Sequence, residues 1–141
     1  MAKASPSQRT LHLCKQFGWT VQIVERWNAF ARVRQDLFGV IDLVAVTNHP
    51  DKPNSIIGIQ TTSGSNHSAR IEKSLAEPRL NSWMKAGGRF HVWSWAKKGD
   101  RGARKLWTVR IDEIKLVDGK PVIIDVTGKF VLDHKISYSY E

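Results

Sequence analysis

The sequence contains a single cysteine, Cys14, among its 141 residues. One cysteine excludes an internal disulfide and a zinc site built from cysteines. It also favours a reducing, cytoplasmic compartment. Cys14 stands beside Leu11 and Leu13 in a helix-forming stretch, which predicts a buried core residue rather than a reactive thiol.

Long apolar runs are also missing. No segment reaches the roughly 20 apolar residues that a membrane-spanning helix needs. The stretch MAKASPSQRTLHLCKQFG carries charge without a long apolar core, so we expect neither a secretory signal nor a membrane partner. No internal repeat, low-complexity tract or linker interrupts the chain, and we expect one domain over residues 1–141.

Acidic residues are few relative to basic ones. Thirteen Asp and Glu accompany twenty-two Lys and Arg, which gives a formal net charge of +9. Residues 66–110 hold eleven basic and three acidic side chains, whereas residues 111–141 hold four basic and six acidic ones. This excess of positive charge favours binding of a polyanion such as nucleic acid. The alternatives are a solvated basic surface and a docking face for an acidic protein.

The spacing of apolar residues predicts the elements of an α/β protein. A first helix over 5–17 begins at a Ser5 or Ser7 cap and ends at Gly18. Strands are predicted over 19–27, 40–46, 55–62 and 89–98, and further β segments over 105–114 and 120–133. Residues 28–39 are expected to form a loop or a strand extension.

Between the third and fourth strands the apolar period changes to that of a helix. Ser65 or Asn66 can cap this helix, Pro78 kinks or divides it, and Gly87 ends it. The turn-rich segment TNHPDKPN predicts a hairpin between the second and third strands. The order α-β-β-β-α-β therefore predicts a central mixed sheet flanked by helices, with extra C-terminal strands.

Two polar residues stand out in the predicted strands, Asp42 in VIDLVAV and Gln60 in IIGIQTTSG. A charge buried alone is costly, so Asp42 must lie near a strand end, pair with another group or bind a cation. An antiparallel hairpin would bring Asp42 close to Gln60. Their oxygens suit Mg²⁺ or Mn²⁺, and Asp36 can add a second carboxylate. The predicted metal ligands are therefore Asp42, Gln60 and Asp36.

Each of these residues also has a structural interpretation. Asp42 could cap a turn or pair with Arg34. Gln60 could bind backbone groups at a sheet edge, and Asp36 could cap the turn at DLFG. Glu25, at the end of the first predicted strand, could be a surface residue or a third ligand.

The element order, together with GWTVQIVERW, GVIDLVAV and IIGIQTTSG, resembles the PD-(D/E)XK nuclease superfamily. The likeness is closest to archaeal-type Holliday-junction resolvases and covers residues 5–96. It implies a restriction-endonuclease-like αβββαβ core. It also implies an Mg²⁺- or Mn²⁺-dependent endonuclease that hydrolyses DNA phosphodiester bonds, acts on branched DNA in repair or recombination, and works as a homodimer.

The resemblance assigns catalytic roles to Asp42, Gln60 and Thr62, and Asp36 and Lys73 complete the predicted catalytic set. Asp42 and Gln60 take the metal-holding positions, and Thr62 takes the position of the usual lysine. Gln60 is neutral, so Asp36 or Glu25 would have to add charge. Thr62 cannot act as a lysine, so Lys73 or Arg70 on the following helix would replace it. Because both usual groups are missing, a module that binds nucleic acid without cutting it is the alternative function.

Basic and polar residues around the predicted second helix are candidates for nucleic-acid binding. They are Arg34, Ser63, His67, Arg70 and Lys73. The start of a helix favours phosphate. The structural alternatives are solvated helix side chains, a surface histidine and a hydroxyl that satisfies the preceding turn. Of the six tryptophans, Trp93 and Trp95 are predicted core residues, and one of the six could stack on an unpaired base.

Overall fold

The computed structural model describes residues 4–47, 55–99 and 101–131 of the chain. Its helices are α1 (Pro6–Gln16), the short 3₁₀ helix η1 (Gly64–Asn66), α2 (His67–Leu75), α3 (Pro78–Lys85) and α4 (Thr127–Val131). Its strands are β1 (Thr20–Ile23), β2 (Arg26–Asn28), β3 (Val33–Gln35), β4 (Leu43–Thr47), β5 (Ser55–Ser63), β6 (Arg89–Lys98), β7 (Leu106–Val117) and β8 (Lys120–Asp125). The predicted turn between β4 and β5 falls largely on residues 48–54, outside the described residues.

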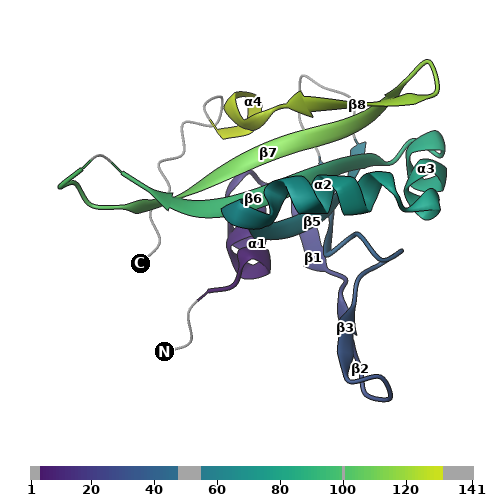
Figure 1. Cartoon of the computed structure of the whole chain (residues 1–141), viewed down its shortest axis with the longest axis horizontal. Coiled ribbons are helices and arrows are strands. Elements are labelled where there is room, and N and C mark those ends of the chain that lie inside the picture. Colours follow the sequence, from purple (N-terminus) through teal and green to yellow (C-terminus); the bar gives the residue numbers. More distant parts are fainter. Residues whose placement is uncertain (1–3, 48–54, 100, 132–141) are drawn as a thin grey trace.

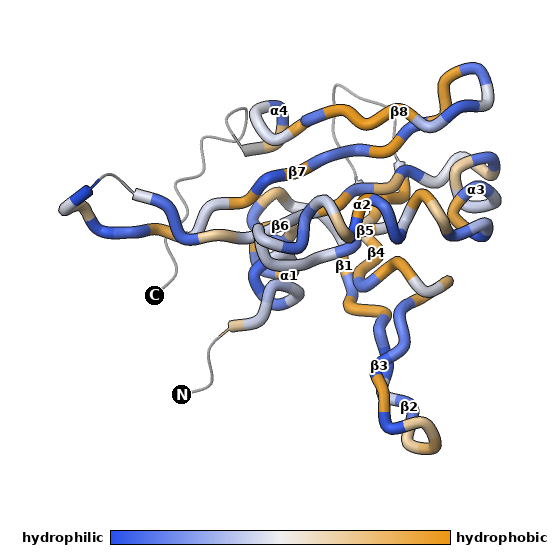
Figure 2. The backbone as a smooth tube through the Cα atoms, viewed as in Figure 1, coloured by the Kyte–Doolittle hydropathy of each residue, from blue (hydrophilic) through white to orange (hydrophobic). Residues whose placement is uncertain are grey.

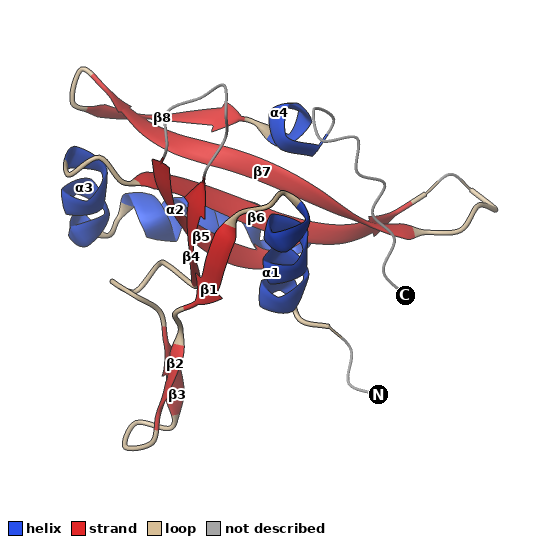
Figure 3. Ribbon diagram, turned by 180° about the vertical axis from the view of Figure 1, so that it is seen from behind, coloured by secondary structure: helices blue, strands red, loops and turns tan. Residues whose placement is uncertain are grey.

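Six strands form one mixed sheet in the order β1-β4-β5-β6-β7-β8. Its pairs are antiparallel except for β5 and β6, which run parallel. Figure 1 shows α2 in front of the sheet, and Figure 3, seen from behind, shows α1 in front of it. The predicted α/β class with a mixed, helix-flanked sheet is therefore confirmed. None of the helices in these described ranges has the length and apolarity of a membrane span.

Two apolar clusters pack on opposite faces of this sheet. Trp93 and Trp95 of β6 join Cys14 of α1 in one cluster, as predicted. The alternate β6 residue Val92 joins Ile71 of α2 in the other. Burial raises the pKa of the Cys14 thiol, which fits a core residue. The edge strand β8, in contrast, exposes Val122, Ile123 and Ile124, and Figure 2 shows that this strand is largely hydrophobic.

Three predicted elements differ from the structure. The chain leaves the first strand after Ile23, and residues 26–35 form a separate two-stranded hairpin of β2 and β3. Strand β4 begins at Leu43, so Asp42 lies just before the strand rather than inside it. The last predicted β segment ends at Asp125, and the chain then forms α4, because the Asp125 carboxylate accepts the Thr127 backbone N–H at 2.9 Å.

Local sequence explains the helix ends. Ser5 caps α1 by accepting the Gln8 backbone N–H at 3.2 Å, and the Gln8 side chain accepts the Ser5 N–H at 3.0 Å. Gly18, with φ at +82°, follows the end of this helix. Pro78 divides the predicted second helix, because it begins α3 where its missing N–H costs nothing.

We expect Ser5→Ala to lower the free energy of unfolding by about 1 kcal/mol, because the first turn of α1 loses its cap. Chemical denaturation measured by circular dichroism would report this change. Ser82→Ala, an exposed helix position in α3, is the matched control and should not destabilise the protein. Equal stability of Ser5→Ala and the unaltered protein would contradict the capping role.

Candidate functional site

A cavity of about 820 Å³ lies where α1, α2 and the hairpin meet the sheet. Eight of the nine predicted site residues line it: Arg34, Asp36, Asp42, Gln60, Thr62, Ser63, Arg70 and Lys73. The start of α1 and the end of β1 complete the wall. Residues from six separate segments therefore meet in one place.

Asp42 and Gln60 lie side by side, as predicted from the hairpin. The Gln60 Nε2 donates to Asp42 Oδ2 at 2.6 Å, and the Thr61 backbone N–H donates to the same oxygen at 2.8 Å. The backbone of Asp42 extends the β4–β5 pairing, since its N–H donates to the Ile59 carbonyl at 2.8 Å. Asp42 is only 4% exposed, so its carboxylate is held firmly at the base of the cavity.

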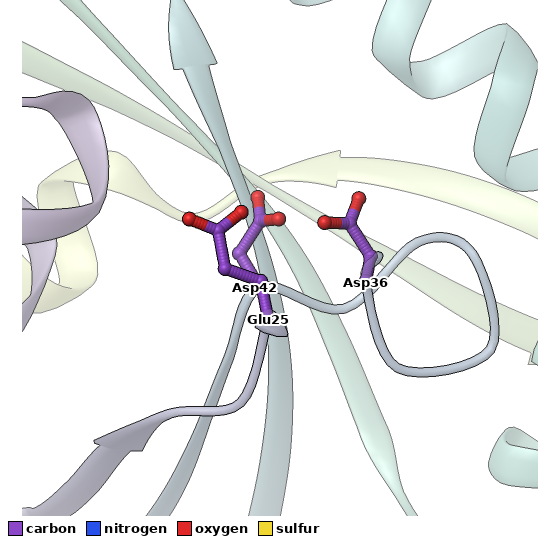
Figure 4. Close-up of side chains that lie close together, drawn as sticks. All are labelled: Glu25, Asp36 and Asp42. Atoms are coloured by element: carbon purple, nitrogen blue, oxygen red, sulfur yellow. The ribbon is translucent and has the colours of Figure 1, made fainter. Parts of the chain in front are cut away.

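Two further carboxylates approach Asp42. One oxygen each of Glu25, Asp36 and Asp42 lies within 4.8 Å of the others, and Figure 4 shows the three groups side by side. The backbone enforces this arrangement. The Asp42 carbonyl accepts the N–H of Val24 at 2.8 Å and that of Glu25 at 3.2 Å, so Glu25 is fixed beside Asp42.

Asp36 reaches the cluster through a tight loop. The backbones of Leu37 and Ile41 donate to each other's carbonyls at 2.9 Å, which folds residues 37–41 back on themselves. Gly39 takes a φ of +76° inside this loop. The Gly39 N–H bonds to the Asp36 backbone carbonyl at 3.0 Å, which leaves the Asp36 side chain for the cluster.

The cluster makes ionisation of Asp42 unfavourable. Burial of the carboxyl, its hydrogen bond with Asp36 and the negative charges of Asp36 and Glu25 raise its pKa to about 8, while the Thr61 N–H opposes the rise. Without a cation, three carboxylates this close cannot all carry charge at low cost. A positive ion at this point would remove the penalty.

Basic side chains approach the rim of the cluster. Lys73 Nζ lies 3.8 Å from Asp36 Oδ2, and the Arg34 guanidinium lies 2.9 Å from Glu25 Oε1. Arg34 therefore pairs with Glu25, not with Asp42 as one alternative proposed. Arg70 lines the same cavity three residues before Lys73. The site thus joins an acidic floor to a basic rim, an arrangement that suits a cation together with a phosphate.

Gln60 provides a second indication of a ligand. Its side chain is buried, at 1% exposure, and its Oε1 has no hydrogen-bond partner within the described ranges. An unpaired buried oxygen is costly. Gln60 Nε2 already donates to Asp42, so Oε1 is left as a free oxygen donor in the cavity wall. Three carboxylates and this oxygen are the hard ligands that Mg²⁺ and Mn²⁺ prefer.

His67 is the predicted nucleic-acid contact that the structure places elsewhere. Its ring is 3% exposed and lies outside the cavity wall. Nδ1 is 2.6 Å from the Ser94 hydroxyl, and Nε2 is 2.7 Å from the Asp112 carboxylate. The ring is therefore committed to buried partners and fixes the start of α2, the helix that carries Arg70 and Lys73.

Some cavity residues went unrecognised in the sequence. Thr61 bonds Asp42 through its backbone, and its hydroxyl lies 3.0 Å from the Ser7 hydroxyl of α1. Glu25 was noted as a possible ligand, and its alternation with Val21 and Ile23 was the signal that could have placed it with Asp42. Thr61 offered no comparable signal, because its shorter bond to Asp42 comes from the backbone N–H at 2.8 Å, with the hydroxyl at 3.4 Å.

The raised pKa of Asp42 predicts how stability depends on pH. Between about pH 4 and pH 8 the unfolded chain releases this proton while the folded chain keeps it, so the free energy of unfolding falls as pH rises through this window. In EDTA, the melting temperature of Asp42→Asn should fall less between pH 5 and pH 8 than that of the unaltered protein. The groups facing Asp42 are Glu25, Asp36, Lys73 and Arg34, and all remain in the variant.

Glu72→Gln, on the exposed side of α2, is the matched control and should keep the pH dependence of the unaltered protein. Thermal melts followed by circular dichroism give the comparison. An identical pH dependence in Asp42→Asn and the unaltered protein would show that Asp42 ionises normally in the fold.

Comparisons with known proteins identify no relative from which the site could be interpreted. No family model, no curated protein and no solved structure matches this chain. Its chemistry therefore rests on three converging carboxylates, one unpaired amide oxygen and the basic rim around them.

Proposed function

We propose that the protein is a metal-dependent endodeoxyribonuclease of the PD-(D/E)XK type. The observation that carries the proposal is the convergence of Glu25, Asp36 and Asp42 within 4.8 Å in an open cavity. Arg34 and Lys73 approach Glu25 and Asp36 from the rim. Asp42 at the base of the cavity instead accepts from the neutral groups of Gln60 and Thr61, and burial beside two acids makes its ionisation unfavourable.

The residues present fit a divalent cation. Glu25 and Asp36 supply the charge that Gln60 lacks, and Gln60 offers its unpaired Oε1. When bound, Mg²⁺ or Mn²⁺ would polarise a phosphate and lower the pKa of a water molecule. The residues that coordinate the metal directly would be Asp42, Asp36, Glu25 and Gln60.

Lys73 and Arg70 take the roles that depend on positive charge. Lys73 lies 3.8 Å from Asp36, so its ammonium reaches the cluster from α2 although Thr62 occupies the usual lysine position. Arg70 and Lys73 would hold the phosphate and offset the charge that develops on it during hydrolysis. Thr62 is buried in the cavity wall, where its hydroxyl can orient a bound group but cannot supply a charge.

The order of elements supports the finer family assignment. Without the β2–β3 hairpin and the short helix η1, the chain runs α1-β1-β4-β5-α2-α3-β6, with β5 and β6 parallel. If α2 and α3 count as one helical connection, this is the αβββαβ order of restriction-endonuclease-like proteins, with β7 and β8 added at one edge. In this assignment the hairpin is an insertion between the first two core strands.

The charge distribution supports DNA as the substrate. The β6–β7 hairpin exposes a basic series made of Lys97, Lys98, Arg101, Arg104 and Lys105, and the chain carries a net charge of +9. Such a surface binds the phosphate backbone with strong salt dependence. Branched DNA and a homodimer are the substrate and assembly that the resemblance predicts.

A second candidate function is a nucleic-acid-binding module that does not cut. The neutral Gln60 and the hydroxyl of Thr62 favour it, because they replace an acid and a lysine. Both functions predict DNA binding, so metal binding and cleavage are the measurements that separate them.

Isothermal titration calorimetry should detect Mn²⁺ binding to the unaltered protein. Asp42→Asn and Asp36→Asn should each weaken it at least about tenfold, because each removes one negative oxygen ligand. Glu72→Gln removes an equal charge from the exposed side of α2 and should leave Mn²⁺ affinity unchanged. Equal affinity in all four proteins would show that Mn²⁺ does not bind at this cluster.

Incubation with duplex, single-stranded and four-way-junction DNA in Mg²⁺ or Mn²⁺ tests cleavage. We expect Asp42→Asn to reduce the rate at least about 100-fold, since metal catalysis contributes several kcal/mol. Lys73→Ala should reduce it by about 100-fold or more through lost charge stabilisation. Lys85→Ala, on the exposed side of α3, should cut normally. Intact DNA and Mn²⁺ binding without cleavage of any substrate would establish the binding module instead.

A further inference from the structure

The hairpin of β2 and β3 projects from the body of the protein (Figure 1). It pairs Arg26 with Gln35, Trp27 with Arg34 and Asn28 with Val33. A two-stranded ribbon of this kind has no core of its own and is marginally stable in water. Its two ends are the acidic residues Glu25 and Asp36, so it rises directly from the carboxylate cluster.

The hairpin exposes aromatic side chains. Trp27 is 61% exposed and Phe30, at the tip, is fully exposed, while Val33 on the return strand is also accessible. The tip is ordered by Asn28, whose Oδ1 accepts the N–H groups of Phe30 at 3.0 Å and Ala31 at 3.1 Å. Two exposed aromatic side chains on one short, hydrogen-bonded hairpin are unusual for a surface with no binding role.

The charge of the hairpin indicates what binds there. Residues 26–35 contain Arg26, Arg32 and Arg34 and no acidic residue. A second copy of the same hairpin would bring like charges together. A nucleic acid complements both features of the hairpin, because its phosphates can bind the arginines and its base faces can stack on the aromatic rings.

The pairing of the strands aims this surface at the cavity. Trp27 and Arg34 are opposite each other in the ribbon, so their side chains share one face. Arg34 lines the cavity and lies 2.9 Å from Glu25. A base stacked on Trp27 is therefore next to the arginine that borders the carboxylates.

We propose that the β2–β3 hairpin binds DNA at unpaired bases, which stack on Trp27 and Phe30 while the hairpin arginines hold the adjoining phosphates. Base faces are accessible to an aromatic ring only where the bases are unpaired or unstacked. The hairpin thus selects DNA with unpaired nucleotides beside a duplex for the neighbouring cavity. This inference rests on the proposed nuclease function for its biological role, but the binding itself requires no cleavage.

Binding measured in EDTA by fluorescence anisotropy tests the inference independently of catalysis. The two probes are a duplex with a single-stranded gap and a fully paired duplex of the same length. Trp27→Ala with Phe30→Ala should weaken binding to the gapped DNA by about 5- to 150-fold and leave duplex affinity nearly unchanged. Trp27→Phe should retain most of the preference. Ile123→Ala, an exposed apolar position on β8, is the matched control.

A 2-aminopurine placed in the gap reports stacking directly. Its emission should fall when the unaltered protein binds and should fall much less with the double variant. The inference would be overturned if the double variant lost equal binding affinity for gapped and for paired DNA, or lost affinity for neither. Sedimentation of the same proteins adds a third outcome, because a dimer that the double variant dissociates would make the hairpin a protein interface and overturn it as well.

Discussion

The candidate site depends on the hydrogen bonds that hold Asp42 where β4 begins. Its backbone N–H bonds to Ile59 of β5, and its carbonyl accepts the N–H of Glu25 beyond the end of β1. Its carboxylate accepts from Gln60 at 2.6 Å. Because backbone and side chain are both fixed, the carboxylate cannot turn away from Asp36 and Glu25. The sheet therefore holds three acids together, and Asp42 keeps its proton up to about pH 8 because ionisation beside Glu25 and Asp36 is unfavourable.

Asp42 distinguishes the cluster from the buried ion pairs of the fold, although Glu25 and Asp36 meet Arg34 and Lys73 at the rim. Elsewhere the buried acid Glu113 is paired with Arg89 at 2.7 Å and Asp112 with His67 at 2.7 Å. In the cluster, Asp42 receives neutral donors, and burial with two acidic neighbours raises its pKa. Stability spent in this way is typical of a functional site. In the proposed function, a bound cation would offset the cost of keeping the three acids together.

The sequence predicted the sheet and the Asp42–Gln60 pair because both depend on local alternation and on one hairpin. It did not predict the end of the first strand, because Glu25 continues the alternation of Val21 and Ile23 and no apolar signal marks the change of direction. The buried role of His67 depends on Asp112, 45 residues away. A contact between distant strands has no local pattern, so the position of His67 near Arg70 indicated a phosphate contact.

The β2–β3 hairpin connects the proposed DNA-binding surface to the carboxylates through the backbone. Glu25 and Asp36 are its two ends, and Arg34 inside it pairs with Glu25. The body of the protein holds one end through the Asp42 carbonyl and the other through the backbone bonds between Leu37 and Ile41. A ligand that tilts the hairpin must therefore act on two of the three carboxylates. If the proposed DNA and cation both bind, linkage requires that any change DNA makes in the affinity for the cation is matched by an equal change that the cation makes in the affinity for DNA.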